Sequence, residues 1–470
     1  MKRLLFIVFC LFLYIGSFAW AETFTTQQTL SDDETFTVDS DDTYFYDYYR
    51  VIDAVGHSNV TVTNNGNVIA HKNEGSPTEL DACGNGCNDT IDASGSLNFT
   101  LTNNGTIWAG EQRVIDLRDA TGTITVTNNA GATIASGERM GSSHLHGVLD
   151  LSEAGSSGDT ITITNHGTIQ NVEKNYAIID LDSMTSGAIV NFTNTGTIRQ
   201  GTSTYGKNND ANRNINIGDS TDEINFTNSG TIQSNRRVFL IGGSTNFTLT
   251  NSGTIKQDGY THDGVSDGAA PNANTSNTIE VGTSGSGATI INSGTISAFA
   301  QNNHAITIGD NDANEAHSNA TIENSGTISA GSDDYGRAII IIPSASGTIT
   351  SGTTIKVKEE AEFTGGIDLG KTVSTIVLDS SIKKDITIYI YNYDDDLTIT
   401  NNLTGNDTYT LTSENLDSGV DSDADDGILT ILGEDLEIGQ DNPKYRSENV
   451  LTKMRGLFDA ANYINWHFPE

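Results

Sequence analysis

One short phrase recurs along this chain and limits the folds that are open to it. The phrase is Asn251-Ser252-Gly253-Thr254-Ile255, and copies of it, one of them stretched, occur nine times. The glycines of successive copies lie 23 to 41 residues apart, a spacing typical of solenoid repeats. Because the phrase is constant while the spacing varies, we expect it at a fixed corner of each coil, with the extra residues in loops. The copies begin at Asn64, Asn103, Asn128, Asn165, Asn194, Asn228, Asn251, Asn292 and Asn324.

The residues before each copy predict β-strands. Apolar and polar residues alternate there, as around Ile224 and Phe226 or around Phe247 and Leu249. This alternation, with β-branched and aromatic residues, is typical of a strand with one buried face. Asparagine and glycine tolerate positive φ, so we expect the chain to bend sharply at the phrase without steric cost. In coils stacked in parallel, the asparagines would lie about 4.8 Å apart and hydrogen-bond as a ladder.

These patterns predict an all-β fold, a right-handed parallel β-helix (β-solenoid) with a short C-terminal helix. A β-sandwich with isolated turns is the alternative, but a sandwich has no reason to repeat one phrase nine times. A solenoid grows by adding coils, so one elongated domain accommodates the length. The expected segments are a signal peptide at 1–21, an aromatic-rich N-terminal capping segment at 22–50, β-helix repeats at 51–345, closing coils at 346–440, and an amphipathic terminal helix at 441–470.

The first residues predict export. A basic start at Lys2 and Arg3 precedes an apolar run, and Ala19-Trp20-Ala21 matches a signal-peptidase site, so we expect the mature chain to begin at Glu22. The predicted location is the cell surface, the outer membrane or the medium, or the periplasm without a translocator. In an exported chain the closely spaced Cys83 and Cys87 favour a small-loop disulfide, because a zinc site needs about four ligands.

The charge and the loops bear on possible partners. With 61 acidic and 24 basic residues the chain has a net charge of −37, which excludes nucleic acid as a partner. The longest loops each follow the strand after a corner phrase, so we expect them along one edge of the rod. Insertions confined to one edge commonly mark a binding face, although neutral decoration is equally compatible with them. These loops span 70–90, 135–147, 199–213 and 256–278.

A second repeat places one aspartate at matching positions of successive coils: Asp53, Asp92, Asp116, Asp150 and Asp180. Stacked carboxylates repel, which raises their pKa values or recruits a cation. One hypothesis is therefore a polysaccharide lyase or glycoside hydrolase that uses Asp116 and Asp150 with Arg113. The row, however, recurs evenly along the rod, whereas an active site is local. We therefore predict an architectural role, with no catalytic, cofactor-binding or metal-ligating residues.

A run of acidic residues near the C-terminus is similar to a calcium-binding loop. Asp421, Asp423, Asp425 and Asp426 alternate as EF-hand ligands do, but Gly427 comes one place late and Leu432 stands where the EF-hand needs glutamate. The pattern therefore favours a solvated acidic loop, and calcium binding stays the alternative.

The signal peptide, the repeated phrase and the closing run from Ile367 to Arg446 resemble the passenger region of autotransporters, the proteins of type V secretion. Within that run, 397–403 resembles the autochaperone-like end of a passenger, and 445–466 is similar to the segment leading into the translocator barrel. The family's barrel is absent before Glu470, so we expect a barrel that is encoded separately or lost. The resemblance implies a structural and adhesive rod without cofactors, whose loops contact cell-surface or extracellular glycans or proteins.

Overall fold

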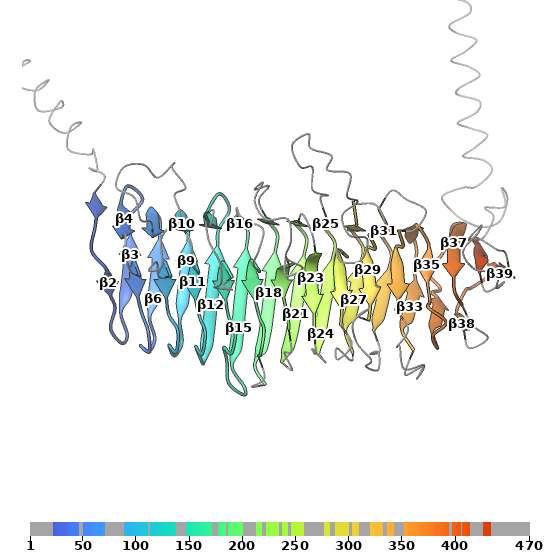
Figure 1. The fold of residues 1–470 in the computed structure, drawn as a ribbon, viewed down its shortest axis with the longest axis horizontal. Helices are drawn as coiled ribbons and strands as arrows, with labels where there is room; N and C mark the ends of the chain where they lie inside the picture. The colour runs from blue at the N-terminus through green and yellow to red at the C-terminus, as the bar shows by residue number, and fades with distance from the viewer. Residues whose placement is uncertain are drawn as a thin grey trace, which may run out of the picture.

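The structure is a computed structural model that describes residues 22–46, 50–70, 89–110, 113–137, 147–171, 177–184, 187–200, 213–218, 222–234, 237–242, 246–257, 277–282, 287–299, 303–309, 320–331, 336–342, 352–393, 397–405, 407–413 and 426–433. These residues form strands that stack into three long sheets, and the result is an elongated parallel β-helix (Figure 1). The predicted all-β fold class is confirmed. A search of the same ranges for an apolar helix long enough to cross a membrane finds none.

As far as β36 (Thr375–Leu378), each sheet collects every third strand of the helical path. Sheet 1 comprises, in stacking order, β1 (Thr23–Phe24), β4 (Thr43–Tyr46), β7 (Asn67–Ala70), β10 (Thr106–Ala109), β13 (Thr133–Ser136), β16 (Thr168–Asn171), β19 (Thr197–Gln200), β22 (Thr231–Ser234), β25 (Thr254–Gln257), β28 (Thr295–Ser297), β31 (Thr327–Ser329) and β34 (Glu362–Thr364). Sheet 2 comprises β2 (Gln28–Thr29), β5 (Ile52–Asp53), β8 (Ile91–Asp92), β11 (Ile115–Asp116), β14 (Leu149–Asp150), β17 (Ile179–Asp180), β20 (Arg213–Asn216), β23 (Arg237–Ile241), β26 (Ile279–Val281), β29 (Ile306–Ile308), β32 (Ile339–Ile341), β35 (Ile367–Asp368), β37 (Ile386–Tyr391), β40 (Gly427–Leu432) and β39 (Thr408–Ser413). Sheet 3 comprises β3 (Thr35–Val38), β6 (Thr61–Asn64), β9 (Thr100–Asn103), β12 (Thr123–Asn128), β15 (Thr160–Asn165), β18 (Ile189–Asn194), β21 (Glu223–Asn228), β24 (Phe247–Asn251), β27 (Thr289–Asn292), β30 (Thr321–Asn324), β33 (Thr354–Val357), β36 (Thr375–Leu378) and β38 (Thr398–Asn401).

One coil runs from sheet 3 through the asparagine–glycine corner to sheet 1, and then by a connection of variable length to sheet 2. The path β9, β10, β11, β12 is one such turn, and β12 lies in register beside β9, with Asn128 opposite Asn103. In each strand the alternate side chains turn inward, so Ile107, Ile134 and Ile169 stack in one buried column. The hydrophobic core is therefore a continuous column of such layers along the rod.

The nine repeat asparagines form one continuous column of hydrogen bonds. In each rung the side-chain amide donates to the side-chain oxygen of the asparagine in the next coil, at 2.7 to 2.8 Å, from Asn64 to Asn324. All nine side chains are buried. A buried amide is costly unless its donors and acceptor are satisfied, and this column satisfies them along the whole ladder.

The structure corrects our explanation of the glycine in the repeat phrase. We expected positive φ at this corner, but apart from Gly131 in the stretched copy, the glycines of the phrase do not have it. A Cβ atom on Gly105 would instead collide with the carbonyl oxygen of Gly66 in the preceding coil, and one on Gly196 would collide with that of Gly167. The glycine is thus required by the close approach of neighbouring coils. Positive φ occurs at the turn between sheets 2 and 3, for example at Asn59 and Asn98.

The two ends of the described rod differ from its middle. At the N-terminal end, Tyr44 stacks on Phe24 at 4.4 Å between ring centroids and meets Phe36 edge-on at 5.3 Å. At the C-terminal end the parallel coils continue past the last corner phrase, and sheet 2 then closes with the antiparallel strands β40 and β39. The expected signal peptide and terminal helix lie outside the described residues.

Candidate functional site: a charged column on sheet 2

The predicted row of aspartates lies on adjacent strands of sheet 2. Backbone pairing sets Asp53 beside Asp92, Asp92 beside Asp116, Asp116 beside Asp150, and Asp150 beside Asp180. Ile115 and its equivalents point into the core, so the aspartate that follows each of them points away from it. Asp116 is nevertheless 0% exposed and Asp150 only 2% exposed. The row ends at Asn216, whose side-chain amide donates to Asp180 at 2.9 Å.

Arginines three residues before the aspartates connect one coil to the next. Arg50 forms an ion pair with Asp53 of its own coil at 3.3 Å and a closer one with Asp92 of the following coil at 2.6 Å. Arg113 in the same way contacts Asp116 at 3.6 Å and bonds Asp150 of the following coil through Nε. Each arginine therefore neutralises acids in two coils and fastens those coils to each other.

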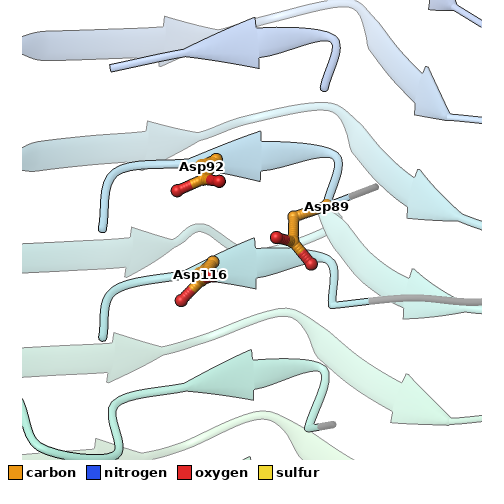
Figure 2. Close-up of side chains that lie close together, drawn as sticks. All are labelled: Asp89, Asp92 and Asp116. Carbon is orange, nitrogen blue, oxygen red and sulfur yellow. The ribbon is translucent and has the colours of Figure 1, made fainter. Parts of the chain in front are cut away.

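Asp89 breaks this pattern, because it stands three residues before Asp92 where the neighbouring coils have Arg50 and Arg113. One carboxylate oxygen from each of Asp89, Asp92 and Asp116 lies within 4.8 Å of the others. Figure 2 shows Asp92 and Asp116 on adjacent strands, with Asp89 beside them on the segment that leads into β8. The substitution of an acid for a base thus creates a cluster of three buried carboxyl groups.

The three carboxyl groups do not share their charge equally. Burial, followed by the negative charge of Asp116, raises the pKa of Asp89 to about 7. Burial works in the same direction on Asp116, but hydrogen bonds from Arg118 and the charge of Arg113 outweigh it and hold the pKa of Asp116 below its usual value. Burial also raises the pKa of Asp92. Asp89 is therefore the group that carries a proton near neutral pH, while Asp116 stays ionised.

The cluster does not fit a metal site. Calcium takes six to eight oxygen ligands, and this group brings together the carboxyl groups of three residues. The guanidinium of Arg113 already lies 3.6 Å from both Asp89 and Asp116. A second cation would be repelled by that charge, so the arginine and a proton on Asp89 balance the cluster in its place.

Farther along the rod the same corner of sheet 2 carries other buried polar groups. Arg237 forms an ion pair with Glu280 of the next coil at 2.7 Å, which continues the coil-to-coil rule. Burial and then the charge of Arg337 lower the pKa of His304 to about 4. The backbone N–H of Arg337 donates to Nδ1 of His304 at 3.1 Å, and its guanidinium lies 3.7 Å from the ring centroid of Tyr391.

The sequence predicted some of this arrangement and missed the rest. The aspartate row was predicted, and so was the rise in pKa, which occurs at Asp92 and at Asp180, where burial and then the charge of Asp150 raise the pKa to about 6. The fall in the pKa of Asp116 was not expected. The role of Asp89 was also missed, and the signal available for it was its position three residues before Asp92.

Several predicted features lie outside the described residues. They include Cys83 and Cys87, the interiors of the four longest loops, and Asp421 to Asp425. The remaining member of the acidic run, Asp426, is buried and accepts a hydrogen bond from the backbone N–H of Asn392 at 3.0 Å. One of the candidate calcium ligands therefore already accepts a hydrogen bond from the main chain just after β37.

Comparisons with protein-family models, with curated proteins and with solved structures found no match to this chain.

Proposed function

We propose that this protein is an exported structural and adhesive rod of the autotransporter-passenger type, which presents variable loops to glycans or proteins of cell surfaces. The rod is a parallel β-helix, and the buried asparagine column together with the continuous core makes each coil a near copy of its neighbours. Such a scaffold holds many attachment points at fixed spacing. Weak contacts made at several of them add through avidity.

The position of the longest connections carries the proposal. All four leave a strand of sheet 1 and return to the adjacent corner of sheet 2, namely between β7 and β8, β13 and β14, β19 and β20, and β25 and β26. The corner with the asparagine column keeps one short phrase throughout. The two longest connections, β7–β8 and β25–β26, therefore leave one edge of the rod, as insertions do that form a binding face in repeat proteins. Connections from sheet 2 to sheet 3 vary as well, from 5 residues between β23 and β24 to 12 between β29 and β30.

The competing proposal is a glycan-cleaving enzyme that uses Asp116, Asp150 and Arg113. Burial argues against it, because these side chains are at most 8% exposed and bond to one another. A catalytic acid or base must come within hydrogen-bond reach of its substrate. We therefore propose a non-enzymatic role. If the protein cleaves a polysaccharide, and Asp116→Asn abolishes the cleavage while the variant stays folded, the enzymatic proposal is favoured.

Binding to arrays of glycans and to intact cells tests the adhesive role. The informative variant has residues 258–276 scrambled, which preserves their length and composition but not their order. We expect wild-type binding that weakens in this variant, with an unchanged thermal midpoint. A protein that binds no glycan, surface protein or cell, or a scrambled variant that binds as well as wild type, would contradict presentation by this loop.

Export is tested separately. The resemblance predicts that the chain leaves the cytoplasm and loses its first 21 residues. N-terminal sequencing of the protein purified from its native cells should therefore begin at Glu22. An intact Met1 on the mature protein would contradict export through a cleaved leader.

A further inference from the structure

The outer face of sheet 3 carries a regular array of threonines. In the eight strands from β3 to β24, two outward positions of each strand stand in register with those of its neighbours, and these sixteen positions hold fourteen threonines and two asparagines. Figure 1 shows these strands side by side in one row. We call this surface the threonine face. Its two columns are Thr35, Thr61, Thr100, Thr125, Thr162, Asn191, Asn225 and Thr248, and Thr37, Thr63, Thr102, Thr127, Thr164, Thr193, Thr227 and Thr250.

The residues that alternate with these threonines point into the core, so the two columns stay on the outer surface of the sheet. Between the two columns lie Val62, Leu101, Ile163 and their equivalents, which are buried in the core. The two asparagines also keep the pattern, since the side-chain amide of Asn225 donates to Asn191 in the adjacent strand at 3.3 Å.

The threonine face lacks charge in a strongly acidic protein. None of its sixteen positions is charged or aromatic, although the chain has 61 acidic residues. The nearest strand carboxylate, Glu223, is the next outward residue of β21, beside Ile189 of β18, and accepts a hydrogen bond from the side-chain amide of Asn225 at 2.9 Å. Past β24 the same sheet does carry charge, with Glu323 opposite Lys356.

Strand preference explains threonine but does not explain this exclusion. Threonine is favoured on the exposed face of any sheet, and sheet 1 also has a threonine column. Beside that column, however, sheet 1 places Trp108, Gln170, Arg199 and Lys256. Bulky and charged residues are therefore tolerated on a neighbouring face of the same coils.

We propose that the threonine face binds ice. Its side chains repeat at about 4.8 Å from strand to strand and about 6.7 Å along each strand. Both repeats are close to the repeats of water oxygens on the prism face of hexagonal ice, and each threonine offers a hydroxyl to hydrogen-bond that lattice and a methyl group to order water. Charged groups hold water in shells that do not match the lattice, which accounts for their exclusion here. A crystalline polysaccharide fits less well, because this face has no aromatic ring on which sugars could stack.

This inference does not depend on the adhesive role proposed above, because it concerns a different face of the rod. The test measures thermal hysteresis and the shape of ice crystals in solutions of the purified full-length chain, and adsorption of the fluorescently labelled chain to a single ice crystal. We expect hysteresis, faceted crystals and adsorption to prism planes. A wild-type protein that neither lowers the freezing point below the melting point nor adsorbs to ice overturns the proposal.

Two double variants locate the binding surface. Thr102→Tyr with Thr127→Tyr places bulky rings in the middle of the threonine face, whereas Thr168→Tyr with Thr197→Tyr places the same rings on sheet 1. Tyrosine retains a high strand preference, so both proteins should fold, and circular dichroism checks that they do. We expect the first variant to lose most of the hysteresis and the second to keep it. Equal loss in both variants, or none in the first, contradicts the assignment to this face.

Discussion

The side-chain amide of Asn165 donates to the side-chain oxygen of Asn194 in the next coil at 2.7 Å, and also to the backbone carbonyl of Thr197 at 3.2 Å. One buried side chain thus connects the corner of its own coil to both the corner and the following strand of its neighbour. A hydrogen bond left unmade in a buried site costs more than the bond itself contributes. The column is therefore cooperative in the sense that one missing rung leaves groups unpaired in two neighbouring coils.

The middle of this column should be more sensitive than its end. Asn194→Ala removes the acceptor of Asn165 and the donor to Asn228, and leaves a cavity, so we expect a loss of about 2–5 kcal/mol. Asn64→Val should cost about 1–2 kcal/mol, because the neighbouring coil beyond it already has Val38 at this position and the Asn103 oxygen keeps the N–H of Gly105. Chemical denaturation followed by circular dichroism measures both. Equal losses would contradict the ladder as a source of stability.

The glycine of the repeat phrase gives a second prediction. In Gly196→Ala the new methyl group meets the carbonyl oxygen of Gly167, so the coils must move apart, and we expect a loss of about 1–3 kcal/mol. Gly282→Ala is the matched control, because this glycine has ordinary φ and the nearest atom to a new Cβ is the Ile241 oxygen at 3.4 Å. Its denaturation midpoint should stay close to that of wild type. If Gly196→Ala is as stable as wild type, close approach of the coils does not explain this glycine, and its conformational freedom becomes the better explanation.

Asp89 should make the rod less stable as the pH rises. Its folded pKa of about 7 lies above its ordinary value of 3.8, so its contribution to stability is fully present below about pH 4 and is lost as the pH rises through 7. Asp89→Asn should therefore be more stable than wild type at pH 8, by up to about 4 kcal/mol, and nearly equal to it at pH 4. Thermal midpoints across this range measure the difference. A gain that is the same at both pH values would show that Asp89 does not carry the proton.

His304 should respond in the opposite direction. Its folded pKa of about 4 lies below its ordinary value of 6.5, so the stability it contributes is present above pH 6.5 and is lost as the pH falls toward 4. Protonation also breaks the hydrogen bond from the backbone N–H of Arg337, because Nδ1 then has no free lone pair. His304→Asn, which reproduces Asn277 of the preceding coil, should remove about 3 kcal/mol of acid sensitivity. Midpoints for wild type and variant at pH 7 and pH 4 provide the comparison, and parallel declines on acidification would exclude His304 as the cause.

These sites also show how far the sequence alone could lead. The asparagine column and the aspartate row were predicted because each depends on a residue's position within its own strand, and that position repeats visibly. The sequence grouped Arg113 with Asp116 and Asp150 only as a catalytic hypothesis, and the structure brings the three together as an ion-pair network. The contact of Arg113 with Asp89 was not predicted, because it crosses between coils over a connection of unpredictable length. The same limit applies to Gly105, whose reason for being glycine is an oxygen 39 residues earlier in the chain.

The threonine face could not be predicted from the sequence alone, because it becomes visible only when the strands are aligned in register. Threonine at alternate positions is unremarkable in a single strand, and strand pairing is needed to set Thr63 beside Thr102 and Thr102 beside Thr127. The exclusion of charge from these columns becomes visible only after that alignment.

The most direct test of the stacked-coil account is a set of distances between spin labels along the outer face of sheet 3. Cysteines that carry the labels replace Thr102 and one of Thr227, Thr250 or Ile291, with Cys10, Cys83 and Cys87 changed to serine. These partners lie in successive coils, although 23 residues separate the first two and 41 the last two. The account predicts distances of about 19, 24 and 29 Å, because each coil adds about 4.8 Å however long its loop is. Increments that grow with the number of intervening residues would contradict it.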